Sequence, residues 1–319
     1  MQTSQKMNIV IAGIGGVGGY LGGKLAYHYA GNQHVRINFI ARGEHGMSIR
    51  DKGLELISGG VVYNCRPSLV SDDPSTIGPA DLLVICSKNN GVMDILIEYA
   101  KCITSDTIII TIQNGVIGKE LIEAGISSGA TLMQGSIYIA SNIIQPGKVA
   151  HLSGPASFTF GTDGKIDSKG EALAKIFTDA GIDAKFTNEI SAVLWKKFMF
   201  VSPAAVVTAL FKIPFPFILQ SNKAKDLFIK LVSELMQLAT AKNILIDEHT
   251  IENNLSFIGK FTGEAKSSFQ LDLEKNKPTE IEALVKYVLS EAENCQVPVP
   301  FYHQAFVKLK EMYPMLADY

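Results

Sequence analysis

A glycine-rich stretch near the N-terminus constrains this 319-residue chain more than any other feature. Seven glycines fall within the eleven residues 13–23, directly after the apolar run "NIVIA". Each glycine inside a helix costs about 1 kcal/mol relative to alanine, so helix formation alone does not explain this composition. The spacing Gly13-x-Gly15-x-x-Gly18, after a strand pattern and at the start of a helical one, is typical of a dinucleotide-binding βαβ unit.

The residues of this fingerprint have separate expected roles. Gly13 permits the tight turn, Gly15 lets the backbone approach a pyrophosphate, and Gly18 lets the next helix pack closely on the strand. The N-terminus of that helix presents free N–H groups to the anion. A glycine-rich turn without a ligand is the alternative. We predict that the cofactor is bound by Gly13, Ile14, Gly15, Gly16, Val17 and Gly18.

The end of the second predicted strand, 36–41, indicates which dinucleotide the chain prefers. NAD-binding proteins place Asp or Glu there to accept the ribose 2′-OH. Here Arg42 follows the strand directly, and a guanidinium can hold a 2′-phosphate through charge-assisted bonds. Glu44 is the alternative NAD-type acid, and a solvated turn position is the alternative role for Arg42. We predict NADP (NADPH) as the cofactor.

Short apolar segments alternate with helical patterns in the first half of the chain. The predicted strands are 8–13, 36–41, 81–87, 106–113 and 130–140, and the predicted helices are 17–30, 91–103 and 117–125. This alternation predicts an α/β fold with a Rossmann-type, doubly wound parallel sheet. "GGVVYNC" and "GKVAHLSGPASFTFG" carry turn residues and partial alternation, which favour antiparallel hairpins.

Helical patterns dominate after Ser168, apart from one short strand, "DAKFT". The predicted helices of this region are 189–211, 221–243, 247–262 and 278–295. The sequence therefore predicts an α/β domain over residues 1–186 and an all-helical domain over residues 187–319.

Charge and composition exclude several function classes. A formal net charge of −2 argues against nucleic acid or an anionic membrane surface as the main partner. The longest uncharged apolar run, 198–211, has fourteen residues and contains Pro203, which is too short to span a bilayer. The N-terminus has no signal-peptide pattern, so we expect a cytoplasmic protein. Cys, His and acidic residues show no metal-ligand spacing, and we predict no metal site.

Polar residues follow two of the predicted strands, and others stand in the helical half. Lys88 and Asn114 lie at carboxyl ends of strands, where open α/β sheets bind ligands. Lys196 and Lys197 precede the long apolar run, and one of the two must point nearer the buried face. Pro278 is expected to open a helix with Glu280 in its first turn.

These segments together resemble the ketopantoate reductase (2-dehydropantoate 2-reductase) family. The resemblance runs nearly from end to end, and its motifs are "GIGGVGGYLGGKLA", "IARGEH", "SKNN", "IQNGV", "PGKVAHLSG", "LWKK" and "SSFQLDLEKNKPTEIE". It implies NADPH-dependent reduction of the ketone of 2-dehydropantoate to (R)-pantoate, a step towards pantothenate and coenzyme A. It also implies that the helical domain binds the substrate.

The resemblance assigns roles to individual residues. It makes Lys197 the proton donor and Glu280 its polar partner, which also contacts the cofactor. Lys88 and Asn114 are implied to contact both cofactor and substrate. Ser268 is implied to bind the substrate together with Lys197, Arg42 to bind the 2′-phosphate, and Ala140 to contact the cofactor through its backbone. Structural roles remain open for each: a solvated strand-end lysine, a turn asparagine, a capping serine, a snorkelling lysine or a helix-dipole glutamate.

One departure from the family pattern concerns the substrate. Members that make pantoate usually carry asparagines four and eight residues after the catalytic lysine, where this chain has Val201 and Ala205. Ser202 is the neighbouring polar side chain that could supply a contact instead. A different 2-oxo acid is therefore an alternative substrate, and a non-catalytic NADPH-sensing protein is an alternative of another class. The predicted partner is a small-molecule 2-oxo acid, and a homodimer is compatible with this function.

Overall fold

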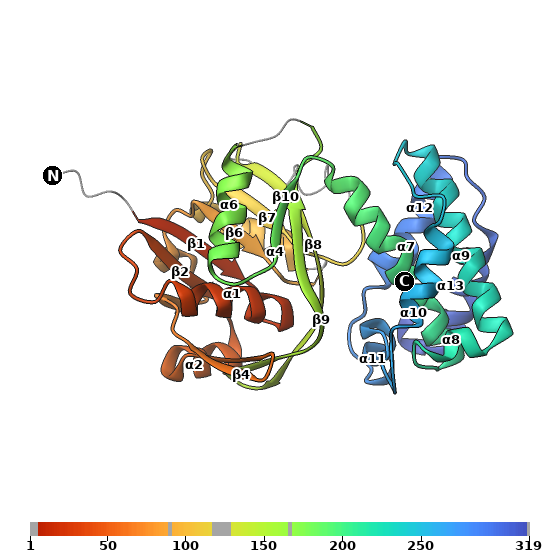
Figure 1. Ribbon diagram of the computed structural model, residues 1–319, viewed down its shortest axis with the longest axis horizontal. Coiled ribbons are helices and arrows are strands. Elements are labelled where there is room, and N and C mark those ends of the chain that lie inside the picture. Colours follow the sequence, from red (N-terminus) through yellow and green to blue (C-terminus); the bar gives the residue numbers. More distant parts are fainter. Residues whose placement is uncertain (1–5, 89–90, 117–128, 165–167, 318–319) are drawn as a thin grey trace. The chain divides into compact units, whose positions relative to one another are not determined.

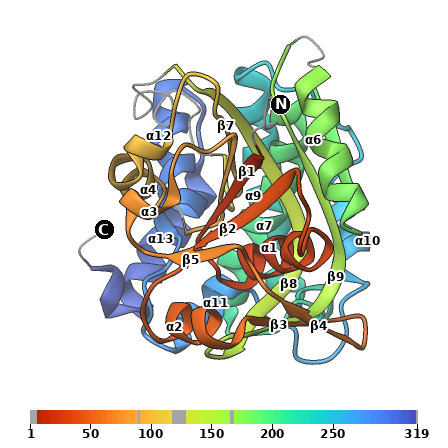
Figure 2. The same cartoon turned by 90° about the vertical axis from the view of Figure 1, so that its left-hand side faces the viewer.

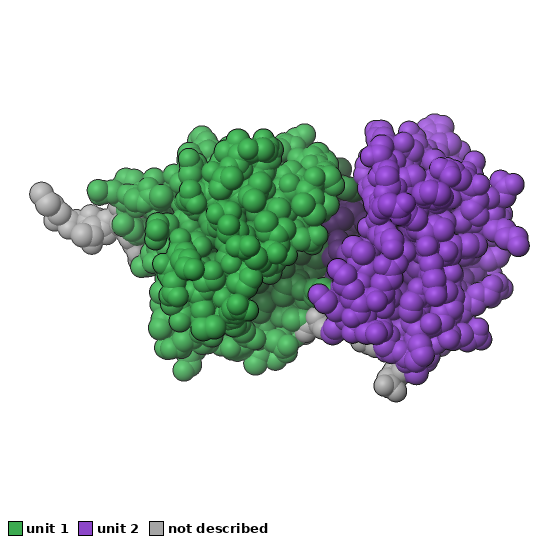
Figure 3. Space-filling model, turned by 90° about the horizontal axis from the view of Figure 1, so that it is seen from below, with its two compact units in different colours: residues 1–113, 118–190 green, residues 114–117, 191–319 purple. Residues whose placement is uncertain are grey.

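The computed structural model describes residues 6–88, 91–116, 129–164 and 168–317 of the chain. It divides into two compact units, coloured separately in Figure 3. Unit 1 comprises Met1–Gln113 and Gly118–Ile190, and unit 2 comprises Asn114–Ile117 and Ser191–Tyr319. The division at 190/191 lies four residues beyond the expected 186/187, and a short segment that includes Asn114 belongs with the second unit.

Unit 1 is built on one mixed sheet. Its strands are β1 (Met7–Ala12), β2 (Val35–Ile40), β3 (Leu54–Ser58), β4 (Val61–Cys65), β5 (Leu69–Ser71), β6 (Leu82–Ile85), β7 (Ile108–Thr111), β8 (Thr131–Gln145), β9 (Lys148–Gly161) and β10 (Ala184–Thr187). Its helices are α1 (Gly16–His28), α2 (Gly43–Lys52), α3 (Pro74–Ile77), α4 (Val92–Glu98) and α6 (Ser168–Asp179), with a 3₁₀ turn at Ala100–Cys102 (Figure 1). The helix predicted at 117–125 lies outside the described residues.

The strand order is β4-β3-β9-β8-β7-β6-β1-β2-β5, with β10 beside β9. Pairs β1–β2, β1–β6, β6–β7, β7–β8 and β2–β5 are parallel. The chain proceeds outward from β1 in both directions, so the order reverses between β1 and β6. Ligands of open α/β sheets bind at the carboxyl ends of strands at such a reversal.

The antiparallel pairs are β3–β4 and β8–β9, which are the segments where the sequence favours hairpins. β9 is also parallel to β3 and β10. The α/β class with a parallel-dominated, doubly wound sheet is therefore confirmed.

Both faces of the central strands β6 and β7 are buried, which is why these strands are continuously apolar. Helices α1 and α6 lie on one face and α3 and α4 on the other (Figure 2). Alternate strand residues such as Ile9 and Ile11 enter the core shared with α1 and α6, and both are fully buried.

Close packing of α1 on the sheet explains the glycines beyond the fingerprint. A Cβ atom at Gly19 would lie 2.6 Å from the Val149 side chain, and one at Gly22 would lie 2.8 Å from the Phe39 ring. Real Cβ atoms do not approach other atoms this closely, so larger residues would push the helix away from the strands.

Unit 2 is helical. It contains α7 (Ile190–Phe211), α8 (Phe217–Gln220), α9 (Asn222–Ala241), α10 (Thr250–Ile258), α11 (Ser268–Glu274), a π-helical turn (Glu282–Lys286), α12 (Tyr287–Asn294), α13 (Pro300–Met312) and a 3₁₀ turn (Pro314–Leu316). The predicted all-helical C-terminal region is confirmed.

Helix α7 alone, among the described residues, has the length and apolarity to cross a membrane. Of its most apolar 18-residue window, 72% is buried inside the protein, as in the core helix of a globular fold. Pro203 lies within it.

The expected helix 278–295 differs in two respects from the structure. It begins at Ile281 rather than at Pro278, and the Thr279 hydroxyl accepts a hydrogen bond from the Ile281 N–H at 3.4 Å just before it. The π-helical turn then interrupts its first part. Glu280 is therefore the N-cap residue rather than a residue of the first turn, and its carbonyl accepts the first helical hydrogen bond, from the Leu284 N–H at 2.9 Å.

Candidate functional site

The glycine loop, residues 13–18, follows β1 at the point where the strand order reverses between β1 and β6. Gly13 has a φ of +89°, which L side chains rarely adopt, and a Cβ there would lie 2.9 Å from the Ser87 nitrogen. A Cβ at Gly18 would lie 2.1 Å from the Gly13 carbonyl oxygen. These close contacts join the ends of β1 and β6 to the first turn of α1.

A dinucleotide fits this cradle in shape and in charge. No atom lies within 4 Å of the position that a Cβ at Gly15 would take, so space is open in front of the loop. Gly15 precedes α1, whose first turn carries no acidic residue, and the N-terminal N–H groups there favour an anion. The hydroxyls of Ser87 and Ser141 beside the loop are buried and have no hydrogen-bond partner in the described structure.

Ala140 and Lys88 are sequence neighbours of Ser141 and Ser87, two residues that contact the glycine loop. Gly16 lies so close to Ser141 that a Cβ would be 1.8 Å from the Ser141 carbonyl oxygen, which places Ala140 next to the loop. Ala140 is exposed on β8 beyond the residues paired with β7, so one edge of its backbone lies outside that ladder. Lys88 is exposed three residues after β6 and follows Ser87.

Arg42 stands at the N-cap of α2, directly after β2. Its guanidinium forms an ion pair with Glu98 at the end of α4. The Arg42 side chain is 56% exposed and that of Glu98 is 40% exposed. No local pattern in the sequence indicates this acidic partner, because it lies 56 residues away.

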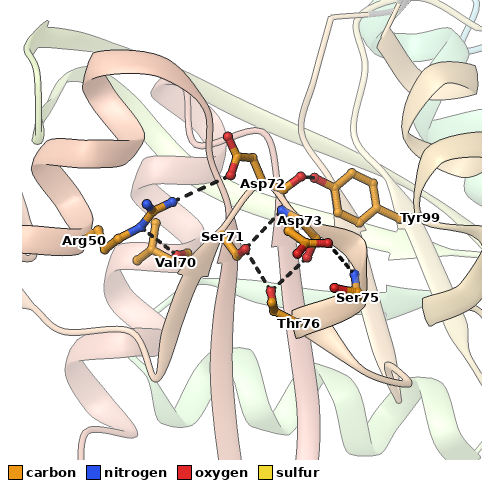
Figure 4. Close-up of polar contacts among 8 residues, drawn as sticks. All are labelled: Arg50, Val70, Ser71, Asp72, Asp73, Ser75, Thr76 and Tyr99. Carbon is orange, nitrogen blue, oxygen red and sulfur yellow. Dashed lines mark hydrogen bonds and ion pairs between the residues drawn. The ribbon is translucent and has the colours of Figure 1, made fainter.

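A network of polar contacts follows β5, next to the end of β2 (Figure 4). Ser71 Oγ accepts hydrogen bonds from the Asp73 N–H at 3.0 Å and from Thr76 Oγ1 at 2.8 Å. The Tyr99 hydroxyl donates to the Asp72 carbonyl at 2.9 Å. A cavity of about 570 Å³ lies between this segment and α2, and its lining includes neither the glycine loop nor Arg42.

A second group of predicted residues meets within unit 2. Lys197 Nζ donates to Asn114 Oδ1 at 3.1 Å, and Asn114 Nδ2 donates to Glu280 Oε2 at 3.1 Å. The amide therefore bridges an ammonium and a carboxylate, and only this orientation of the amide satisfies both. The three residues come from different segments. Asn114 follows β7, Lys197 lies in α7, and Glu280 directly precedes the helix that begins at Ile281.

The two neighbouring lysines of α7 differ as the helical geometry requires. Lys196 is exposed, whereas Lys197 is partly buried and reaches Asn114. Burial lowers the pKa of the Lys197 ammonium from 10.5 to about 8, and the Glu280 carboxylate opposes this by favouring the charged form. A lysine with a pKa of this kind can release a proton near neutral pH.

The serines named from the sequence have different surroundings in the structure. Ser268 is exposed at the first position of α11, and the neighbouring Ser267 caps this helix by accepting from the Gln270 N–H at 3.1 Å. Ser202 is fully buried, and its hydroxyl donates to the Leu284 carbonyl at 2.5 Å. Ser202 therefore does not stand in for the asparagines expected at the positions of Val201 and Ala205.

Val201 and Ala205 follow Lys197 at intervals of four residues, on the same face of α7. Val201 is partly buried, and Ala205 is only 2% exposed. The face of the helix beside Lys197 is apolar at both positions.

Comparison with known proteins covers nearly the whole chain. Residues 9–164 match the family described as ketopantoate reductase PanE/ApbA, and residues 189–312 match its C-terminal domain. A 2-dehydropantoate 2-reductase of Halobacterium salinarum is 25% identical over 296 residues, which cover 92% of this chain and 95% of the relative.

Solved structures show the same fold. A 2-dehydropantoate 2-reductase from Porphyromonas gingivalis superposes with a TM-score of 0.84 and 27% identity, covering 96% of this chain and 99% of that one. A ternary structure of D-mandelate dehydrogenase with NADH and anilino(oxo)acetate has a TM-score of 0.83 at 21% identity, covering 98% and 99% of the two chains.

Adjacent glycines of the loop offer a matched test. We expect Gly16→Ala to lower the free energy of unfolding by about 1–3 kcal/mol, because the new methyl group collides with the Ser141 backbone. Gly15→Ala meets no atom, so its stability stays near that of the wild type while dinucleotide affinity falls. Thermal unfolding and fluorescence titration measure the two effects, and equal stability of both variants would contradict the packing described.

The Lys197 ammonium can be titrated directly by NMR of ¹³Cε-labelled lysine, with Lys197→Met assigning the signal. We expect a pKa near 8 in the wild-type protein. Glu280→Gln removes the charge that favours the ammonium, so the pKa falls further. A wild-type pKa near 10.5 would show that burial does not lower the pKa of Lys197. An upward shift of the pKa in Glu280→Gln would show that the Glu280 carboxylate does not favour the charged form.

Proposed function

Because the chain belongs to the ketopantoate reductase family of oxidoreductases, which act on keto acids, we propose that it reduces 2-dehydropantoate to (R)-pantoate with NADPH. The observation that carries this proposal is the hydrogen-bonded series Lys197–Asn114–Glu280. It unites the residues that such a reaction needs for protonating and orienting a reduced carbonyl. We further propose residues 1–186 as the NADP-binding domain and 187–319 as the substrate and catalytic domain.

Lys197 carries the chemistry that the chain itself supplies. Reduction of a ketone places negative charge on its oxygen, which must be neutralised as it develops. The Nζ ammonium stabilises this charge and then donates a proton to the oxygen. Asn114 holds Nζ in place through its Oδ1 atom, and Glu280 keeps the ammonium charged until the proton is needed.

The family uses a nicotinamide dinucleotide, which supplies the hydride when it is bound. We propose that its pyrophosphate is held by the backbone of residues 13–18 at the N-terminus of α1. Lys88 and the Ala140 backbone border this loop, Arg42 is assigned to the 2′-phosphate, and Glu280 and Asn114 to the nicotinamide end. The open space at Gly15 and the unpartnered hydroxyls beside the loop support this assignment.

A second candidate keeps the reaction and changes the substrate. Val201 and Ala205 make the α7 face beside Lys197 apolar, and hydrogen-bonding pockets discriminate strongly through groups left unpaired. The fold neighbour D-mandelate dehydrogenase is described with anilino(oxo)acetate, a 2-oxo acid with an aromatic group. A bulkier or more apolar 2-oxo acid than ketopantoate is thus the alternative substrate, with Ser268 and Lys88 as proposed carboxylate contacts.

Other expectations from the sequence stay predictions. A cytoplasmic location and a homodimer accompany the proposed function, and a dimeric ketopantoate reductase from Staphylococcus aureus shares the fold at 16% identity. A purely NADPH-sensing protein would not need both Lys197 and Glu280, which disfavours that alternative.

Cofactor choice depends on Arg42. Arg42→Ala should weaken NADPH binding about ten- to a hundredfold, the equivalent of one charge-assisted bond of roughly 1.5–3 kcal/mol, with little change for NADH. Glu98→Gln, which removes the competing carboxylate but keeps the arginine, should bind NADPH at least as tightly as the wild type. Fluorescence titration measures both affinities, and equal losses for NADPH and NADH in Arg42→Ala would assign Arg42 to the fold instead.

Substrate and proton donor are tested together by following NADPH oxidation with ketopantoate and a panel of aliphatic and aromatic 2-oxo acids. We expect Lys197→Ala to lower kcat by about 10²–10⁴-fold, as expected for loss of a general acid, with NADPH affinity nearly unchanged. Lys196→Ala on the exposed face is the matched control and should be close to wild type. Preference for an aromatic acid favours the second candidate, and no turnover of any 2-oxo acid contradicts both.

A further inference from the structure

The π-helical turn at Glu282–Lys286 adjoins the Lys197–Asn114–Glu280 group. A π turn holds one more residue than an α turn, and here the Tyr287 N–H donates to the Glu282 carbonyl five residues earlier. Such turns disturb the regular helical hydrogen bonds and occur often at functional sites. This turn needs partners from outside its own helix to remain stable.

Ser202 on α7 supplies one such partner. It is fully buried, and its Oγ donates to the Leu284 carbonyl, in the middle of the π turn, at 2.5 Å. The Tyr302 hydroxyl on α13 lies 2.7 Å from the same Oγ. A serine hydroxyl has a single proton, so Tyr302 must donate to Ser202 while Ser202 donates to Leu284.

Tyr302 is itself firmly placed. The buried carboxylate of Glu234 accepts from the Phe301 N–H at 2.7 Å and from the Tyr302 N–H at 3.0 Å, which fixes the start of α13. Burial raises the pKa of the Tyr302 hydroxyl, which therefore stays protonated and able to donate. Glu234 thus fixes the position of Tyr302, the residue of the Tyr302–Ser202–Leu284 series that lies outside α7 and the π turn.

The opposite side of the π turn touches the predicted catalytic residues. Leu284 N–H donates to the Glu280 carbonyl at 2.9 Å, which ties the turn to the residue that binds Asn114. Gly115, with a φ of +100°, lies so close that a Cβ would be 3.2 Å from the Ala283 carbonyl oxygen. The turn therefore contacts both Glu280 and the segment that carries Asn114.

We propose that Ser202 and Tyr302 are positioning residues, which hold the π turn so that Glu280 and Asn114 keep their places around Lys197. This inference rests on the proposed function of that group. Without the Ser202 hydroxyl the Leu284 carbonyl would lose this buried hydrogen bond, which favours return of the turn to α-helical geometry. Losing one residue from the turn rotates what precedes it by about 100°, enough to displace the Glu280 carboxylate.

The test compares Ser202→Ala and Tyr302→Phe with Asn254→Ala. Asn254 is a matched control, since its Nδ2 atom donates to the Met199 carbonyl of α7 at 2.9 Å from a buried site outside the π turn. In Ser202→Ala we expect kcat for the preferred 2-oxo acid to fall about a hundredfold and the KM for NADPH to stay unchanged. A loss of this size is typical when a catalytic group is displaced by roughly 1 Å. Tyr302→Phe falls less because it keeps the Ser202–Leu284 bond.

Rescue separates positioning from a general loss of stability. Ser202→Cys keeps a donor of similar size and should recover part of kcat, while Asn254→Ala should lose melting temperature without a comparable loss of kcat. If Ser202→Ala and Asn254→Ala lose kcat equally at equal loss of melting temperature, the proposal is overturned.

A second measurement does not depend on turnover. Displacing Glu280 removes the charge that favours the Lys197 ammonium, so NMR titration should show a lower Lys197 pKa in Ser202→Ala than in Asn254→Ala. An unchanged Lys197 pKa in Ser202→Ala contradicts the positioning role. A wild-type protein that reduces no 2-oxo acid but shows this shift would contradict the proposed function and leave the positioning role supported.

Discussion

The partly buried ammonium of Lys197 is the constraint on which the Lys197–Asn114–Glu280 group depends. A buried charge is costly unless polar groups surround it, and the lowered pKa of Lys197 records that cost. Asn114 offsets it by accepting a hydrogen bond from Nζ at 3.1 Å, and the Glu280 carboxylate, which accepts from the Asn114 amide at 3.1 Å, favours the charged form of the lysine. The three residues come from three distant segments, and Asn114 belongs to the helical unit together with the lysine and the glutamate that it contacts. The ammonium is stable enough to persist and still acidic enough to release its proton.

Much of the fold could be predicted from local pattern. The glycine spacing after β1 and the continuous apolar strands report on backbone geometry and on burial from both faces, which neighbouring residues encode directly. The choice of Lys197 over Lys196 follows from helical periodicity. The Lys197–Asn114–Glu280 group could be named only through the family resemblance, because its members are 83 and 166 residues apart in sequence.

The features that sequence reasoning missed depend on tertiary contacts. A π turn differs from an α turn by one residue, and the apolar pattern of residues 282–286 does not distinguish them. Ser202, which donates to the Leu284 carbonyl of this turn, lies on α7, 82 residues before Leu284 in the chain. Glu280 stands at the N-cap because the helix begins at Ile281, and sequence alone does not settle the exact first residue of a helix. The partner of Arg42 could not be predicted either, since Glu98 reaches it from another helix.

The Arg42–Glu98 pair bears on how firmly the chain can prefer one dinucleotide. Both side chains are well exposed, and an exposed ion pair contributes at most about 1 kcal/mol. A 2′-phosphate offers the same guanidinium a doubly charged, bidentate partner, and charge-assisted bonds of this kind contribute roughly 1.5–3 kcal/mol. A 2′-phosphate bound at Arg42, as proposed, would therefore outcompete Glu98, but displacing the carboxylate would offset part of its advantage. On that proposal Glu98 would moderate the preference that Arg42 creates, and the balance between NADPH and NADH would depend on the pair of residues rather than on the arginine alone.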